Sequence, residues 1–181
     1  MIERVILDLC GGSGEWGRPY REAGYDVRTV DYRDGNDVRL VLFPGKVHGI
    51  LAAPPCTHLS VSGARWWKDK GEDKLLEAMS VVDACLRLVV VCSPEWWALE
   101  NPVGRLKDFI GGPTYSFDPC NHGDNYTKKT LIWGRFRPPM RQPALATERS
   151  KMHLMAPSED RAALRSITPA GFARAFFEAN P

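Results

Sequence analysis

The segment VILDLCGGSG, residues 5–14, constrains the fold of this chain more than any other stretch. Five largely apolar residues, Val5–Leu9, predict a buried strand, and a glycine-rich turn follows at once. A helix over 15–23 and a second strand over 26–31 complete a strand, turn, helix and strand pattern typical of a nucleotide-binding βαβ unit. We therefore predict an α/β protein with a mostly parallel sheet and helices on both faces.

Two acids frame the glycine turn and narrow the choice of ligand. Asp8 lies just before the turn, where it would repel phosphates, and no Gly-Lys-Ser/Thr follows as in a phosphate-binding loop. Asp31 ends the second strand, where an acid holds ribose hydroxyls. This pattern favours a nucleoside ligand that carries an amino group, such as S-adenosylmethionine. Asp37 could accept from the exocyclic amine of adenine, or it could equally be a turn residue beside Gly35 and Asn36.

A cysteine follows the next predicted strand. Residues 50–53 are apolar, and Pro54 and Pro55 stop the strand because neither can donate a ladder hydrogen bond. A rigid loop would then present Cys56 beyond the carboxyl end of the strand, where open α/β sheets bind their ligands. The alternative is a buried and inert thiol, the commoner state of a free cysteine.

The segment WWALENPVG, residues 96–104, predicts a strand that delivers Glu100 and Asn101 to the same edge of a parallel sheet. A thiolate and a desolvated carboxylic acid on neighbouring strand ends suit nucleophilic addition to an electron-poor ring, because the acid can donate to a ring nitrogen. The alternative role for Glu100 is to cap a turn at Asn101 and Pro102.

Three further elements are expected along the chain. Apolar residues at spacings of three and four predict a long helix over 72–92, which Pro94 ends. The segment TKKTLIWGRF, residues 127–136, predicts a later strand entered through a basic turn. A short closing helix follows Thr168, which is expected to cap it before Pro169.

Composition is that of one globular domain spanning residues 1–181, with 44% hydrophobic and 25% charged residues. The net charge is +2, but basic residues gather between Tyr126 and Lys151 against the single acid Glu148. Such a segment could lie along a phosphate backbone or could equally be a solvated surface. Five cysteines without a CxxC motif disfavour a disulfide framework and a zinc site, and suit a reducing cytoplasm. We expect neither a signal peptide nor a membrane-spanning segment.

Taken together, the motifs resemble those of DNA cytosine-5 methyltransferases. DLCGGSG resembles the cofactor-binding first motif of that family, PPC its nucleophile motif and ENP its acid motif. YTKKT resembles the basic motif that contacts the base, and TPAGFARAFFEA the closing helix that returns to the cofactor site. The matches run in family order over nearly the whole chain, and PPC with EN is the specific combination. The segment 131–167 leaves no room for the family's target-recognition domain, so the chain resembles the short methylase-like proteins of phages and prophages.

The resemblance implies a Rossmann-like fold that transfers a methyl group from S-adenosylmethionine to C5 of cytosine in DNA. Cys56 would attack C6 of the base while Glu100 hydrogen-bonds N3. Asn101 would support the nucleophile loop, and Lys128 would lie near O2 of the base. No metal is implied. The residues implied to bind the cofactor are Asp8, Leu9, Cys10, Gly11, Gly12, Gly14, Asp31, Tyr32, Asp37, Val38 and Pro55.

The chain departs from the family pattern at several positions. Cys10 stands where the family places an aromatic ring against adenine, and Thr57, His58 and Leu59 replace Gln-x-Phe after the nucleophile. Lys128, like its neighbour Lys129, stands where an arginine is customary, and lysine cannot make a bidentate contact.

Without a target-recognition domain, sequence reading in duplex DNA is poorly provided for, because a paired base must be flipped out before its ring can be reached. We therefore expect relaxed specificity, a single-stranded or smaller substrate, or a partner protein that reads the sequence. The protein would act in the cytoplasm of a bacterium or of a phage-infected cell, as a monomer or a dimer. Restriction-modification is the process associated with such an enzyme. Trp66 and Trp67 are favoured as core residues, with base stacking as the alternative. Arg65 is favoured as a surface residue over a contact with the nucleic-acid backbone.

Other functions stay open at this point. Methylation of an amino group usually relies on Asp/Asn-Pro-Pro followed by an aromatic residue, whereas Ala53 and Cys56 occupy those two positions here, so it ranks lower. The chain could instead be a non-catalytic accessory protein that binds S-adenosylmethionine or nucleic acid, although the cysteine and glutamate argue against this. It could also methylate RNA or a cytosine nucleotide.

Overall fold

The computed structural model describes residues 4–43, 45–148 and 166–181. Its strands form one sheet in the order β2-β1-β3-β4-β6-β5. The first four strands run parallel, and β6 and β5 run antiparallel beside β4, so the sheet is mostly parallel, as predicted. The strands in chain order are β1 (Val5–Leu9), β2 (Asp26–Val30), β3 (Gly49–Ala52), β4 (Trp96–Pro102), β5 (Tyr115–Phe117) and β6 (Thr130–Arg135).

The direction of β6 changes how the site is assembled. The glycine turn, the Cys56 loop and the end of β4 were expected at one edge of a parallel sheet. The later strand β6 pairs antiparallel with β4, and Pro102 faces Thr130 in the register. The chain therefore enters β6 at the edge where β4 ends. Residues just before β6, Lys128 among them, lie at the same edge as the carboxyl ends of the parallel strands.

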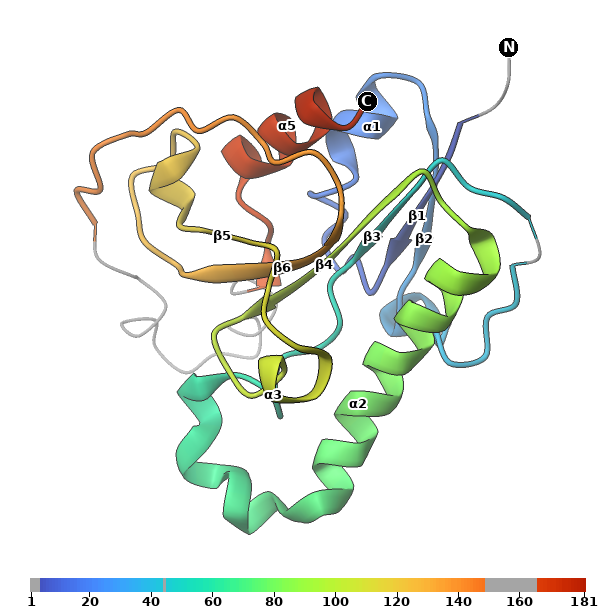
Figure 1. Cartoon of the computed structure of the whole chain (residues 1–181), viewed down its shortest axis with the longest axis vertical. Coiled ribbons are helices and arrows are strands. Elements are labelled where there is room, and N and C mark those ends of the chain that lie inside the picture. Colours follow the sequence, from blue (N-terminus) through green and yellow to red (C-terminus); the bar gives the residue numbers. More distant parts are fainter. Residues whose placement is uncertain (1–3, 44, 149–165) are drawn as a thin grey trace.

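Helices cover both faces of the sheet, as predicted (Figure 1). On one face lie α1 (Arg18–Glu22) and α5 (Ala170–Ala179), and on the other lies the long α2 (Trp67–Cys92). Neighbouring strand residues point to opposite faces, so Ile6 and Leu51 pack toward α1 and α5. Leu7 and Leu99 pack toward α2. The shorter elements are η1 (Tyr32–Asp34), η2 (Val61–Trp66), α3 (Lys107–Ile110) and η3 (Pro119–Asn121).

The helices begin at residues that differ from the predicted ones. α1 starts at Arg18 rather than residue 15, because a turn closed by the Arg18 amide and the Glu15 carbonyl precedes it and Pro19 suits the first helical turn. α2 starts five residues earlier than expected, across a kink at Gly71, whose φ of 72° lies in the left-handed region. α5 begins after Pro169, and Thr168 does not cap it.

The C-terminal helix α5 contacts both the sheet and the region of α1. Phe172 stacks on Phe117 of β5 with ring centroids 3.8 Å apart, and Phe176 packs edge-on against Trp16. The Tyr20 hydroxyl donates to the Asn180 carbonyl at 2.9 Å. These contacts hold residues 168–169, which precede α5, beside the end of the sheet. No helix within the described ranges is both long and apolar enough to cross a bilayer.

Candidate active site

A cavity of about 80 Å³ lies at the carboxyl ends of β1, β3 and β4. Four parts of the chain form its walls: the glycine turn after β1, the loop after β3, the end of β4, and Lys128 together with Ser166 and Thr168. The predicted site residues that line it are Asp8, Cys10, Gly11, Gly12, Pro55, Cys56, Glu100, Asn101 and Lys128.

The glycine turn brings the backbone close to the acids. A Cβ on Gly11 would lie 2.4 Å from an Asp8 carboxylate oxygen, so only glycine fits there. Cys10 and Gly12 have φ values of 55° and 56°, and the Gly12 amide donates to Asp31 Oδ2 at 2.9 Å. The turn therefore connects the ends of β1 and β2 through the backbone itself.

Asp8 is buried at the floor of this turn. Its side chain is 1% exposed and lies 3.5 Å from the Arg21 guanidinium. Burial raises the pKa of Asp8 to about 6, Arg21 opposes the rise, and the nearby Asp31 adds to it. Asp8 therefore titrates close to neutral pH, which is uncommon for a carboxyl group.

The loop after β3 holds Cys56 at the wall of the cavity. The amides of Leu59 and Ser60 both donate to the Cys56 carbonyl at 2.9 Å, which closes a tight turn. The thiol is half-buried and lines the cavity, so it is not packed in the hydrophobic interior. Behind it, the buried Asn101 donates from Nδ2 to the Pro54 carbonyl at 3.0 Å and so braces the loop.

Glu100 on β4 and Lys128, which lies just before β6, both line the cavity. Burial raises the pKa of Glu100 above its ordinary value, and the positive charge of Lys128 opposes the rise. The Lys128 ammonium also donates to the Ile167 carbonyl at 3.5 Å. Asn101 and Pro102 belong to β4, so the alternative in which Glu100 caps a turn at these residues is wrong.

The other predicted cofactor residues do not line the cavity. The Leu9 side chain is fully buried in the core on the α2 side. Gly14, Asp31 and Tyr32 lie around the glycine turn and η1 but outside the cavity wall. Their assignment to the cofactor stays a prediction.

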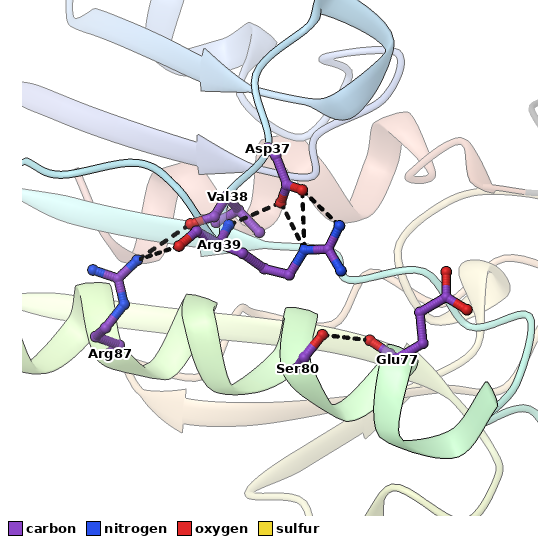
Figure 2. Close-up of polar contacts among 6 residues, drawn as sticks. All are labelled: Asp37, Val38, Arg39, Glu77, Ser80 and Arg87. Carbon is purple, nitrogen blue, oxygen red and sulfur yellow. Dashed lines mark hydrogen bonds and ion pairs between the residues drawn. The ribbon is translucent and has the colours of Figure 1, made fainter. Parts of the chain in front are cut away.

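Asp37 and Val38 lie beside α2, where the segment that carries them is bound to the helix (Figure 2). The Asp37 carboxylate accepts from Arg39 Nε at 2.9 Å, and Arg39 holds the pKa of Asp37 below its usual range. Arg87 on α2 donates to the carbonyls of Val38 and Val41 at 3.3 and 3.1 Å. Both carboxylate oxygens of Asp37 thus already have a cationic partner.

Six residues of the cavity wall were not among the predicted site residues: Trp16, Ala53, Pro54, Pro102, Ser166 and Thr168. Trp16 is 2% exposed, and its indole N–H has no protein acceptor. Thr168 was expected to cap α5 but borders the cavity instead. No motif marks Trp16 or Ser166, because their positions depend on how the two ends of the chain meet.

The tryptophan pair and the basic segment also differ from expectation. Trp66 is 49% exposed, so its assignment to the core is wrong. Trp67 is half-buried, and the guanidinium carbon of Arg105 lies 4.5 Å from the centre of its ring. In the basic segment, Arg135 donates to the Pro94 carbonyl and Arg141 to the Ser116 carbonyl. These contacts give the two arginines structural roles. Two further basic residues, Arg149 and Lys151, fall outside the described residues.

The groups that line the cavity can contact an organic ligand. Gly11 and Gly12 present backbone to it, Asp8 and Glu100 are carboxyl groups whose pKa burial raises, and the buried indole N–H of Trp16 has no protein acceptor. Nowhere in residues 4–43, 45–148 and 166–181 do three His, Cys, Asp or Glu side chains come together as metal ligands.

Comparison with known proteins supports the fold. No protein-family model and no curated protein matches the sequence. Among solved structures, 77 chains match. One is described as a candidate DNA modification methyltransferase encoded within a prophage of E. coli, with 17% sequence identity and a TM-score of 0.51. The match covers 78% of this chain and 53% of that chain, so this chain spans about half the length of the protein it matches. The chain has the Rossmann-like α/β fold of that structure.

Proposed function

We propose that this chain is a methyltransferase that uses S-adenosylmethionine to methylate C5 of cytosine in DNA. The observation that carries the proposal is that Cys56 and Glu100 line one cavity beside the glycine turn of β1. The likeness to a prophage protein described as a candidate DNA modification methyltransferase agrees with it. We further propose that residues 1–181 act as one catalytic domain.

The glycine turn and its acids would hold the cofactor. Gly11 and Gly12 allow it to approach the backbone, Asp31 would accept from its ribose hydroxyls, and Asp8 lies where its amino group would find a carboxylate. Trp16 would offer its indole N–H from the wall. S-adenosylmethionine, when bound, supplies an electrophilic methyl group.

Cys56 would act as the nucleophile toward the base. Its thiolate forms a bond to C6 of cytosine, and the electron pair of the C5–C6 double bond makes C5 nucleophilic. C5 then takes the methyl group. Loss of the C5 proton to a base and departure of the Cys56 sulfur restore the double bond, so cytosine becomes 5-methylcytosine and the thiolate returns.

Glu100 would stabilise the charge that develops on the ring. Because burial raises its pKa, the carboxyl group can carry a proton at a pH where an exposed glutamate would not. A protonated Glu100 can donate to N3 of the base as C6 is attacked. Lys128, just before β6, would contact the O2 atom of the same ring.

Covalent trapping tests this proposal directly. Incubation with DNA containing 5-fluorocytosine and with S-adenosylmethionine should give a covalent protein–DNA complex, because fluorine at C5 cannot leave as a proton. The complex should be absent with Cys56→Ser. A variant of a buried cysteine on α2, Cys92→Ser, serves as the matched control and should still trap. Absence of trapping together with absence of labelled methyl transfer to DNA, RNA and a cytosine nucleotide would refute the proposal.

A further inference from the structure

Exposed apolar side chains lie on two segments that are hydrogen-bonded to each other, the one that follows Cys56 and the one that follows β4. Together they form what we call the Trp66 surface, made up of Val61, Trp66 and Val103 with Arg65. Val61 is 57% exposed, Trp66 49% and Val103 38%. The Arg65 guanidinium lies 4.9 Å from the centre of the Trp66 ring. A half-exposed tryptophan ring with a cation beside it offers a face on which a planar partner can stack.

This surface is joined to the candidate active site by backbone contacts. The Val61 amide donates to the Val103 carbonyl at 2.9 Å, and Val103 follows directly on the cavity-lining Pro102. The Arg105 amide donates to the Leu59 carbonyl, also at 2.9 Å. Figure 1 shows this segment beyond the edge of the sheet, between β3 and the start of α2. The Trp66 surface therefore continues outward from the loops that hold Cys56 and Glu100.

The residues that adjoin Trp66 in the chain carry more cations than acids, which favours a polyanion at Trp66 itself. Residues 61–70 carry Arg65, Lys68 and Lys70 against Asp69, whereas the acids Glu72, Asp73 and Glu77 follow with Lys74 farther along α2. Residues 103–110 carry a further two cations, Arg105 and Lys107, against Asp108. Lys70 also donates to the Thr57 carbonyl at 3.4 Å, which holds its positive charge near the Cys56 loop.

We propose that the Trp66 surface binds single-stranded DNA by stacking the Trp66 ring on an unpaired base next to the target cytosine. The inference rests on the proposed function, because the target base is defined by the cavity that holds Cys56. An aromatic ring flanked by cations is the usual device for binding single strands, since every unpaired base offers a face for stacking. Bases in a duplex are stacked on their neighbours and offer Trp66 no such face.

A binding experiment with fluorescein-labelled oligonucleotides tests the inference. Fluorescence anisotropy is measured without cofactor for a single-stranded 12-mer that contains one cytosine, for the same sequence as a duplex, and for the corresponding RNA. We expect the single-stranded DNA to bind at least tenfold more tightly than the duplex. Trp66→Ala should weaken that binding about tenfold, because stacking on one base contributes a factor of this order. Trp66→Phe should restore part of the affinity.

Matched controls separate this effect from damage to the fold. Val90→Ala removes another exposed apolar side chain, 77% exposed at the far end of α2, and should leave the affinity unchanged. Arg65→Gln should lower the salt dependence of binding as one phosphate contact is lost. Far-ultraviolet circular dichroism should be the same for all these variants.

The possible results distinguish the inference from the proposed function. Equal affinity for duplex and single strand, or no effect of Trp66→Ala, overturns the inference even if trapping by Cys56 succeeds. Tighter binding of RNA than of DNA also overturns it, since the occupant would then be a different nucleic acid. Trp66-dependent binding of single-stranded DNA without trapping and without labelled methyl transfer to DNA, RNA or a cytosine nucleotide would instead support the surface and refute the proposed chemistry.

Discussion

At the scale of single residues, burial controls the two carboxyl groups of the cavity, and it acts on each in a different context. Asp8 is enclosed by the glycine turn and keeps one cationic neighbour, Arg21. Glu100 is enclosed by the sheet and faces Lys128 across the cavity. In both groups burial raises the pKa because a charged carboxylate loses its hydration, and the cation offsets part of that loss.

The raised pKa of Asp8 predicts a loss of stability as its proton leaves. The folded pKa of about 6 lies above the ordinary value of 3.8, so the folded state binds the proton more tightly than the unfolded state. The unfolding free energy should therefore fall by up to about 3 kcal/mol as the pH rises from 4 to 7, at about 1.4 kcal/mol for each pKa unit. Asp8→Asn should remove this contribution.

Urea unfolding at pH 4, 6 and 8 measures the difference in unfolding free energy between wild type and Asp8→Asn. The titration of other groups cancels in this difference. The variant should become more stable relative to wild type as the pH rises. Asp69→Asn, at an exposed position of α2, is the control. A difference that stays constant with pH would show that Asp8 does not titrate as described.

The raised pKa of Glu100 predicts how the rate of methyl transfer declines as the pH rises. If the protonated group donates to the base, kcat/KM for methyl transfer should fall as the pH rises through the folded pKa of Glu100, which burial places above the ordinary value. Glu100→Gln cannot transfer a proton, so it should lose about 10²–10⁴ in rate and lose that decline as well. A profile of unchanged shape in Glu100→Gln would contradict the role assigned to the carboxyl group.

Some of these residues could be found from sequence and others could not. Cys56 and Glu100 follow strands that apolar runs make visible, and strand ends are where α/β folds collect their chemistry. Trp16 gives no such signal, because it reaches the cavity through its packing against Phe172 and Phe176. The exposure of Trp66 was also missed, since composition favours the core for any tryptophan and only tertiary packing decides.

At the scale of elements, the site depends on how the loop after β3 meets the loop after β4. A Cβ on Gly104 would lie 2.0 Å from the Leu59 carbonyl oxygen, so the two backbones approach as closely as glycine permits. The antiparallel bridge between Ser60 and Gly104 fixes their register. The loops that carry Cys56 and Glu100 therefore hold each other in place.

Gly104→Ala should disturb both loops. The added methyl group must displace backbone rather than a flexible side chain, so we expect a loss of about 1–3 kcal/mol in unfolding free energy and slower trapping at Cys56. Gly112→Ala is the matched control, because a Cβ there meets nothing within 4 Å, and it should stay within about 0.5 kcal/mol of wild type. Equal effects of the two substitutions in urea unfolding would contradict the close approach.

Element boundaries and strand directions could not be predicted from the hydrophobic pattern. Apolar periodicity predicted the strands and α2, because burial of one face imposes it. The antiparallel entry of β6 has no periodic signature, since a strand has the same alternation in either direction. The short β5 was not predicted at all, as three residues are too few to establish a pattern.

At the scale of the whole molecule, the C-terminal helix completes the layer over one face of the sheet. Phe172 and Phe176 are fully buried there, and residues 166–169 lead from the cavity wall into the helix. The two ends of the chain thus meet: α1 follows the glycine turn, and α5 packs against α1. Stability and ligand binding should therefore be coupled through this helix.

Phe172→Ala tests that coupling. Loss of a fully buried phenyl ring stacked on Phe117 should lower the unfolding free energy by about 3–5 kcal/mol and weaken the binding of S-adenosylhomocysteine, because Thr168 and Pro169 lose their support. Arg174→Ala, on the exposed side of the same helix, should change neither quantity appreciably. Urea unfolding and isothermal titration calorimetry measure the two effects, and normal ligand affinity in a destabilised Phe172→Ala protein would disprove the link.

The pairing of Pro102 with Thr130 has one more consequence. The chain leaves β4 and enters β6 at the same rung, so the two ends of the excursion over residues 103–129, which contains β5, are already held together. Lengthening such an excursion adds little closure entropy, because the cost grows only with the logarithm of its length. Evolution or an engineer could enlarge it into a substrate-reading appendage and leave the spacing of Glu100 and Lys128 unchanged.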